Sequence, residues 1–212
     1  MIDTAMNHDV FDNARWLIGA IARGLQENQG EGIAETLDRL SEQQIDAAHF
    51  REPEPRFLPV LRHLAQCTAE TMLLDAGVAA AIASLEGHLQ WRQSTSYSDA
   101  VLGEGFIDNY GWCEIVGPHG FFNGDDFLLG LLTLGPGRHY KDHYHPAPEL
   151  YWPLTGGTQW RQGDGGFEAK NAGSIIWHRP NVVHATKTGD APLLALWSWT
   201  RDTGTPARLV GQ

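Results

Sequence analysis

Residues 137–156 read GRHYKDHYHPAPELYWPLTG, and they place three side chains that can bind a metal ion at short intervals. His143 and His145 lie two residues apart, so on a strand both would face the same side. The proline-rich turn at 146–148 would then bring Glu149, on the returning strand, to the same cavity. Two imidazoles and one carboxylate suit a divalent first-row metal ion. The stretch therefore predicts a metal site inside a β barrel.

The same stretch resembles the first metal-binding motif of the cupin superfamily. In that motif a glycine, two histidines, a glutamate and a second glycine recur at fixed intervals, which here fall on Gly137, His143, His145, Glu149 and Gly156. The resemblance is specific because all of these positions are in register. It implies a single cupin barrel, also called a double-stranded β-helix or jelly roll.

A second stretch, GSIIWHRPNVVHA at 173–185, resembles the second cupin motif and implies His184 as a further ligand. His178 is the alternative within this stretch. It ends an apolar run and precedes a proline turn, so we expect it at the rim of the barrel. The expected ligand set is His143, His145, Glu149 and His184.

The chain after residue 94 has the pattern of short strands. Apolar runs alternate with Gly, Pro, Asn and Asp at 127–134, 149–154, 173–177 and 193–199. This spacing favours an antiparallel barrel or sandwich. We therefore predict a mainly-β protein, with the cupin barrel and its metal site at 95–212.

Residues 1–94 have helical periodicity instead. Apolar side chains recur at three- and four-residue steps over 9–25 and 32–40, and an Ala-rich stretch over 69–89 predicts a further helix. A short helix is expected at 57–64, after the two prolines of 51–55. These helices carry no cluster of polar groups, so we expect them to pack on the barrel or to form a dimer surface. The chain would then be a monomer or a homodimer.

Charge and cysteine content exclude several classes of partner. The formal net charge is −11 and Lys and Arg form no run, which argues against nucleic acid and against an anionic membrane surface. The two cysteines make no disulfide framework. Neither a signal peptide nor a long apolar segment is visible, so a cytoplasmic location is expected.

Two tyrosines flank the proposed ligands. Tyr151 lies two residues after Glu149, and the strand period therefore puts it on the same face, beside the metal. A neighbouring divalent cation should lower the pKa of the phenol, so that the phenolate can act as a base. Tyr140 lies three residues before His143 and is a second candidate.

The segment YKDHYHPAPELYW, residues 140–152, is similar to the cupin-type dimethylsulfoniopropionate lyases, the Q-type in particular. The resemblance implies β-elimination of this sulfonium carboxylate to dimethyl sulfide and acrylate, with one divalent ion of zinc, iron or manganese. It also implies that Tyr151 removes the proton and that Tyr140 orients the carboxylate or is the alternative base. His143 would be a looser ligand or a polar contact with the substrate.

Tryptophans could form the pocket for the sulfonium group. Six of the eight lie between residues 112 and 199. Trp197 and Trp199 alternate on one predicted strand, and Trp152 and Trp177 lie on neighbouring ones. An aromatic face stabilises an onium group by roughly 0.5–2 kcal/mol. We predict Trp199, Trp197 and Trp177 as substrate-binding residues, with Trp199 first.

Other functions are compatible with the same ligands. An iron-dependent dioxygenase also uses histidines and a glutamate on a cupin, but it has no need of Tyr151. A sugar-phosphate isomerase would need clustered Arg and Lys, and a non-enzymatic metal or ligand sensor would not need the tyrosine pair. The Gly-rich segment 117–126 is a candidate lid.

Overall fold

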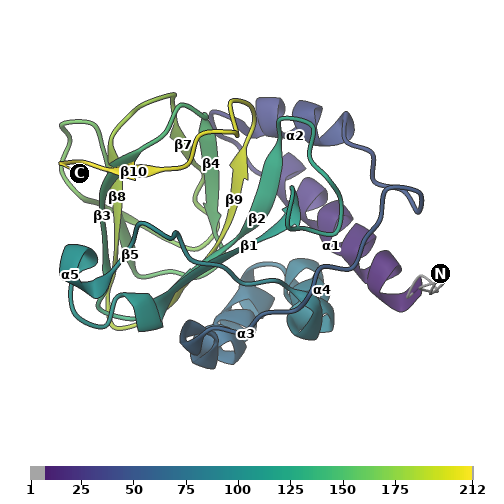
Figure 1. Ribbon diagram of the computed structural model, residues 1–212, viewed down its shortest axis with the longest axis horizontal. Coiled ribbons are helices and arrows are strands. Elements are labelled where there is room, and N and C mark those ends of the chain that lie inside the picture. Colours follow the sequence, from purple (N-terminus) through teal and green to yellow (C-terminus); the bar gives the residue numbers. More distant parts are fainter. Residues whose placement is uncertain (1–7, 212) are drawn as a thin grey trace.

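The computed structural model describes residues 8–211, in which helices cover one side of a β barrel (Figure 1). Within this range the strands form two sheets of five, in the orders β1-β2-β9-β4-β7 and β10-β3-β8-β5-β6. All the named strand pairs are antiparallel. The strands are β1 (Tyr110–Val116), β2 (Leu128–Leu134), β3 (His139–Tyr144), β4 (Glu149–Pro153), β5 (Thr158–Gln162), β6 (Glu168–Lys170), β7 (Ile176–His178), β8 (His184–Thr188), β9 (Leu193–Trp199) and β10 (Arg208–Leu209).

The first sheet, β1-β2-β9-β4-β7, is buried on both faces. Every residue of β2, LLGLLTL, is buried, and so is every residue of β9. Because side chains alternate along a strand, successive residues enter different cores. Leu194 and Leu196 join the core shared with the helices, whereas Trp197 joins the core inside the barrel. The two faces of the sheet are therefore buried in two different cores.

The helices of residues 8–85 form the layer on the outer face of this sheet, whereas the short helix at 99–102 lies against β3 of the other sheet (Figure 1). The buried stripe of α1 includes Ala14, Leu17 and Ile21, and it belongs to the same core as the outward-facing residues of the sheet. Gly24 on α1 lies so close to Trp152 that an added Cβ would be 2.2 Å from its ring. The helical elements are α1 (His8–Gln26), α2 (Ile33–Ser41), η1 (Pro59–His63), α3 (Leu64–Leu74), α4 (Ala76–Leu85), η2 (Glu86–His88), α5 (Asp99–Leu102) and η3 (Ile107–Asn109).

The expected helix at 69–89 is wrong in its extent. Two helices, α3 and α4, occupy this region, and Asp75 separates them in an extended conformation. Its side chain accepts a hydrogen bond from the backbone N–H of Val78 at 2.9 Å, which is the contact of a helix N-cap. In the Ala-rich sequence around it, Asp75 was not recognised as the N-cap that starts a second helix.

The mainly-β fold with an N-terminal helical region is confirmed. The division into residues 1–94 and 95–212 stays a prediction, and the structure shows that the two parts share one core. Across residues 8–211, none of the helices has the length and apolar character that a membrane crossing requires.

Candidate active site

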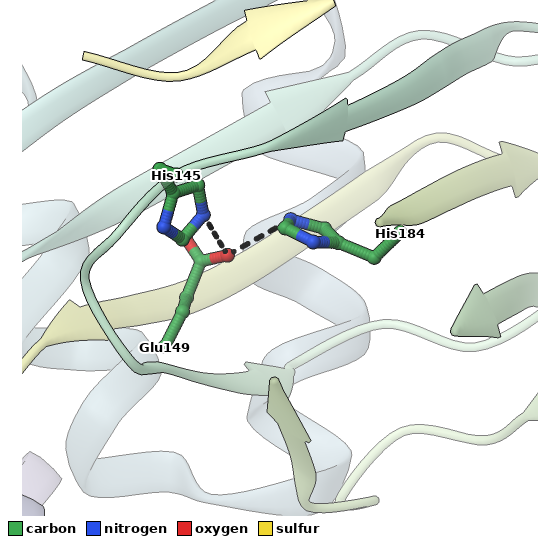
Figure 2. A group of neighbouring side chains, drawn as sticks. All are labelled: His145, Glu149 and His184. Carbon is green, nitrogen blue, oxygen red and sulfur yellow. Dashed lines mark hydrogen bonds and ion pairs between the residues drawn. The ribbon is translucent and has the colours of Figure 1, made fainter. Parts of the chain in front are cut away.

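Three of the four predicted ligands converge at one end of the barrel interior. Glu149 begins β4, His184 begins β8, and His145 follows the end of β3. Their ligand atoms lie within 4.8 Å of one another, and all three residues are buried. Figure 2 shows both imidazoles directed at the same carboxylate oxygen, Glu149 Oε2, which is 3.1 Å from His145 Nε2 and 3.3 Å from His184 Nε2.

The hydrogen bonds of the two histidines leave their Nε2 atoms available to bind a cation. His145 Nδ1 lies 2.9 Å from the carbonyl oxygen of Ala147, and His184 Nδ1 lies 2.9 Å from that of Val182. A carbonyl can only accept, so each Nδ1 carries a proton, and in the neutral imidazole the Nε2 has the lone pair. Two nitrogen lone pairs and a carboxylate therefore point at one place. This donor set suits a divalent metal ion.

His143 lies at the edge of this cluster. Its Nδ1 is 2.8 Å from the carbonyl oxygen of Lys141, so its Nε2 also has the lone pair. Its ring centroid is 4.1 Å from that of His184 and 6.4 Å from that of His145. The pKa of His143 lies well below its usual range, mainly because the ring is buried and secondly because of the charge of His184. His143 is outside the group whose ligand atoms converge, so its role as a ligand stays a prediction.

Positive charge at this cluster favours the ionised form of Glu149. Burial acts to raise its pKa, but the charge of a protonated His145 and the hydrogen bonds from both protonated rings outweigh burial and hold the pKa well below the ordinary value. With neutral imidazoles, a metal ion at the same place would supply that positive charge. The other oxygen of Glu149, Oε1, accepts a hydrogen bond of 2.8 Å from the indole N–H of Trp199. The Trp199 ring also lies against His145, with 4.3 Å between centroids. Trp199 therefore fixes the carboxylate and one imidazole together.

Tyr140 and His143 face the same side because β3 contains a bulge. Tyr140 pairs with Thr186 and His143 with His184, so three steps on β3 match two on β8. The tyrosine ring consequently stacks on His143 at 4.0 Å between centroids. Its hydroxyl is 2.8 Å from that of Tyr97.

Tyr151 faces the barrel interior beside Glu149, as strand parity predicts. It pairs with Trp197 on β9, and its ring contacts Trp160 at 4.8 Å between centroids. Burial raises the pKa of Tyr151 well above its ordinary value, and the negative charge of Glu149 adds to the rise. The protonated phenol is thus the favoured form until positive charge is brought to the site.

A cavity of about 500 Å³ joins these groups. Seven predicted residues line it: Tyr140, His143, His145, Glu149, Tyr151, Trp197 and Trp199. His184 is absent from this lining, although it belongs to the cluster with His145 and Glu149. The cavity places the tyrosines, the candidate metal ligands and two indole rings in a single space.

Trp177 and Trp152 lie elsewhere, and this corrects the expectation for Trp177. Trp177 pairs with Leu150, whose side chain enters the core shared with the helices. The Trp177 ring packs there, against Gly32. Trp152 is buried in the same core. Their strand positions have the opposite parity to Tyr151, so neither reaches the cavity.

His178 is also not where the sequence placed it. It is 1% exposed, rather than at the rim, and its ring stacks on His184 with 4.1 Å between centroids and 15° between planes. Its Nδ1 lies 3.2 Å from Gln162 Oε1. His178 therefore holds the His184 ring in place by stacking on it.

Part of the segment 117–126 forms a wall of the cavity, and its first half is held in place. Backbone bonds join Gly117 to Phe122 and Phe121 to Ile115, and the Arg51 guanidinium donates to the carbonyls of Gly117 and Gly120. Phe121 and Phe122 are fully buried. The role of the segment as a lid stays a prediction.

Several cavity residues were missed because strand β1 was missed. Tyr110, Trp112 and Glu114 lie at alternate positions of β1 and all line the cavity. The alternation in YGWCEIV was the available signal. Tyr97, which contacts Tyr140, comes from an irregular segment and had no signal in the sequence.

Comparison with known proteins gives the family. The sequence profile of the dimethylsulfoniopropionate lyases matches residues 33–195, which is more than half of the chain. The chain belongs to the dimethylsulfoniopropionate lyase family. It is 30% identical over 138 residues to the dimethylsulfoniopropionate lyase DddQ of Ruegeria pomeroyi, and 30% identical over 157 residues to the DddL protein of Cereibacter sphaeroides, which is provisionally named a lyase of the same substrate. The matches cover 65% and 73% of this chain, and 65% and 63% of the respective relatives, a little under two thirds of their length.

Solved structures of the family share the fold. A crystal structure of DddQ from Ruegeria pomeroyi has a TM-score of 0.74 at 22% identity, covering 94% of this chain and 96% of that one. A structure from a study of the dimethylsulfoniopropionate lyases RdDddP and RnDddQII has a TM-score of 0.67 at 24% identity, covering 92% and 98% of the two chains. The mainly-β cupin fold of the dimethylsulfoniopropionate lyase family is thereby confirmed for this chain.

Proposed function

We propose that the protein is a metal-dependent lyase that cleaves dimethylsulfoniopropionate to dimethyl sulfide and acrylate. Two findings support this activity together: the family to which residues 33–195 belong, and a buried tyrosine, Tyr151, beside the cluster of His145, Glu149 and His184. The second finding carries the mechanism, because the reaction begins with the removal of a weakly acidic proton.

A divalent ion of zinc, iron or manganese, held by His145, Glu149 and His184, would supply Lewis-acid stabilisation of the substrate carboxylate and lower the pKa of the neighbouring phenol. Tyr140 and His143 lie on the adjacent part of the cavity wall, where the Tyr140 hydroxyl can donate to that carboxylate and the His143 Nε2 can serve as a further, looser metal ligand. Tyr140 is held for this task by its hydrogen bond with Tyr97.

Tyr151 is the proposed general base. As phenolate it removes the proton α to the substrate carboxylate, the electron pair of that C–H bond forms the C=C bond of acrylate, and the C–S bond breaks. Dimethyl sulfide leaves with the C–S electron pair, and the Tyr151 proton passes to solvent. Tyr140 is the alternative base, but its hydroxyl is already engaged by Tyr97.

The indole rings provide the surface for the sulfonium group. Trp197 and Trp199 both line the cavity, with 5.9 Å between ring centroids. Trp199 uses its N–H and one face on Glu149 and His145, whereas the Trp197 N–H has no protein partner within residues 8–211, so both rings offer aromatic surface to the substrate cation from different sides of the site. A mostly apolar wall also favours release of neutral dimethyl sulfide.

Headspace detection of dimethyl sulfide tests the proposal. Purified protein loaded with zinc, iron or manganese is mixed with dimethylsulfoniopropionate, and a sample treated with EDTA is the control. We expect release that chelation abolishes and that re-added metal restores. No release with any of the three metals would overturn the proposal, and consumption of oxygen by the iron-loaded sample would favour the dioxygenase alternative.

A further inference from the structure

Glu114 is a buried acid in the cavity wall that the reaction described above does not use. The residue is 3% exposed and lines the cavity from β1. Its one hydrogen bond within residues 8–211 is from the backbone N–H of His119 to Oε2. None of the described Lys, Arg or His residues forms an ion pair with it. Buried carboxylates in proteins are ordinarily paired with a cation, so the carboxylate of Glu114 is available to pair with a cationic ligand.

The sheet register connects Glu114 with the reaction site. Glu114 pairs with Gly130, Gly130 with Trp197, and Trp197 with Tyr151, so the four residues form one row across the inner face. Neighbouring strands are about 4.8 Å apart, which puts the backbone of Glu114 three strands, or about 14 Å, from that of Tyr151. The space between them is the cavity.

Gly130 allows the Trp197 ring to bridge this distance. A Cβ at Gly130 would lie 2.9 Å from atoms of the Trp197 ring, which therefore extends over β2 toward β1. There its ring meets Trp112 edge to face, with 6.0 Å between centroids. Glu114 lies two residues from Trp112 on the same face of β1, with its Oε2 turned to the His119 N–H, so two indole rings and one carboxylate line the same cavity. This is the chemistry of a site for an onium cation, where the rings supply polarisable surface and the acid supplies charge.

Arg92 and Arg51 form no ion pair with Glu114, but their charges act to lower its pKa. The Arg92 guanidinium lies over Trp112, 5.7 Å from the ring centroid. The net pKa of Glu114 is raised, because burial outweighs the His119 N–H, Arg92 and Arg51, which act in the opposite direction. A cation bound against the carboxylate would lower this pKa and favour the ionised form.

We propose that Glu114, with Trp112 and Trp197, forms the subsite that selects a substrate carrying a fixed positive charge at the end opposite its carboxylate. The inference rests on the proposed function for the site as a whole, because the carboxylate end must lie at the histidine cluster. Glu114, which takes no part in proton removal, would then select carboxylates with a sulfonium or quaternary ammonium group over carboxylates whose opposite end is neutral.

A matched pair of carboxylates that differ in charge tests this subsite in a binding measurement. 3-(Trimethylammonio)propanoate and 4,4-dimethylpentanoate have the same shape, and only the first carries a positive charge. Their affinities for the zinc-loaded protein are measured by calorimetry in the wild type and in Glu114→Gln, which keeps an oxygen to accept the His119 N–H. Glu104→Gln, at an exposed glutamate outside the cavity, is the control for loss of one negative charge.

We expect Glu114→Gln to weaken binding of the cationic ligand about tenfold and to leave the neutral ligand within about twofold, as for a partly desolvated charge contact. Glu104→Gln should change neither affinity. Equal weakening of both ligands, or of neither, would overturn the role of Glu114. Neutral-ligand binding in the same variant also reports that the fold and the metal site are intact. Failure of the lyase proposal is a separate result, namely absence of dimethyl sulfide release from wild-type protein.

Discussion

Alternate residues of the same strands face two different environments in the first sheet. On β4, Leu150 and Trp152 enter the core shared with the helices, whereas Glu149 and Tyr151 face the cavity. Both sets are buried, so exposure does not separate them. The difference lies in the partners: apolar side chains on the outer face, and hydrogen-bonding or ionisable groups on the inner one. Strand parity is therefore what divides residues that hold the fold from residues that can do chemistry.

Removal of an inner-face ligand should have the largest effect. In Glu149→Ala we expect bound metal to be lost and dimethyl sulfide release to fall more than about ten-thousandfold, because Lewis-acid stabilisation and activation of the base are lost together. Metal is measured by elemental analysis of the purified variant, and release by headspace analysis. Normal metal stoichiometry would remove Glu149 from the ligand set.

Removal of the inner-face base should separate chemistry from metal binding. Tyr151→Phe takes away one hydroxyl and should lower kcat by about a hundred- to ten-thousandfold, with metal content unchanged. Tyr140→Phe, assayed in parallel, compares the alternative base. If Tyr151→Phe kept its rate with full metal while Tyr140→Phe lost it, the roles of the two tyrosines would be exchanged.

An outer-face tryptophan should affect stability instead of activity. Trp152 is 1% exposed and packs against Gly24, so Trp152→Ala should lower the free energy of unfolding by about 3–5 kcal/mol. The folded fraction should keep its metal affinity and its kcat, because the side chain does not reach the cavity. Denaturant unfolding gives the first quantity and steady-state assays give the others. A large loss of kcat with little loss of stability would break the division between the two faces.

The smallest effect is expected from the hydrogen bond that fixes the carboxylate. Trp199→Phe keeps a ring against His145 but loses the N–H donor to Glu149, which should weaken metal affinity about 10–100-fold. Trp197→Phe is the matched control, because the Trp197 N–H has no partner within residues 8–211. Competition with a fluorescent zinc chelator measures both. Equal affinities in the two variants would show that the indole N–H does not support the site.

Local patterns predicted much of the fold and the centre of the site. Helix α1 and strand β9 were expected nearly where they lie, because their apolar periodicities are unbroken. The candidate ligands His145, Glu149 and His184 come together because motif spacing encodes which strand ends meet. The ligand atoms of these three residues converge, as the cupin resemblance implied.

The remaining features have physical causes that a single sequence does not display. Trp177 was expected in the cavity, but its side chain faces the other core because β7 pairs with β4 in a register that sequence spacing does not reveal. Tyr140 was expected at the site, but its stacking on His143 depends on a bulge in β3, which breaks the two-residue period. The segment 117–126 has the composition of a flexible loop, yet Arg51, more than sixty residues away in sequence, donates to two of its carbonyls. Long-range contacts decided each case.

A metal titration decides whether one ion per chain switches the activity on. Metal-free protein is titrated with zinc, iron(II) or manganese(II) while dimethyl sulfide release from dimethylsulfoniopropionate is followed. We expect release to rise in proportion to bound metal and to reach its plateau at one ion per chain, as one cluster of His145, Glu149 and His184 requires. Release that is already complete in metal-free protein, or that stays absent at full occupancy with every metal, would contradict this expectation.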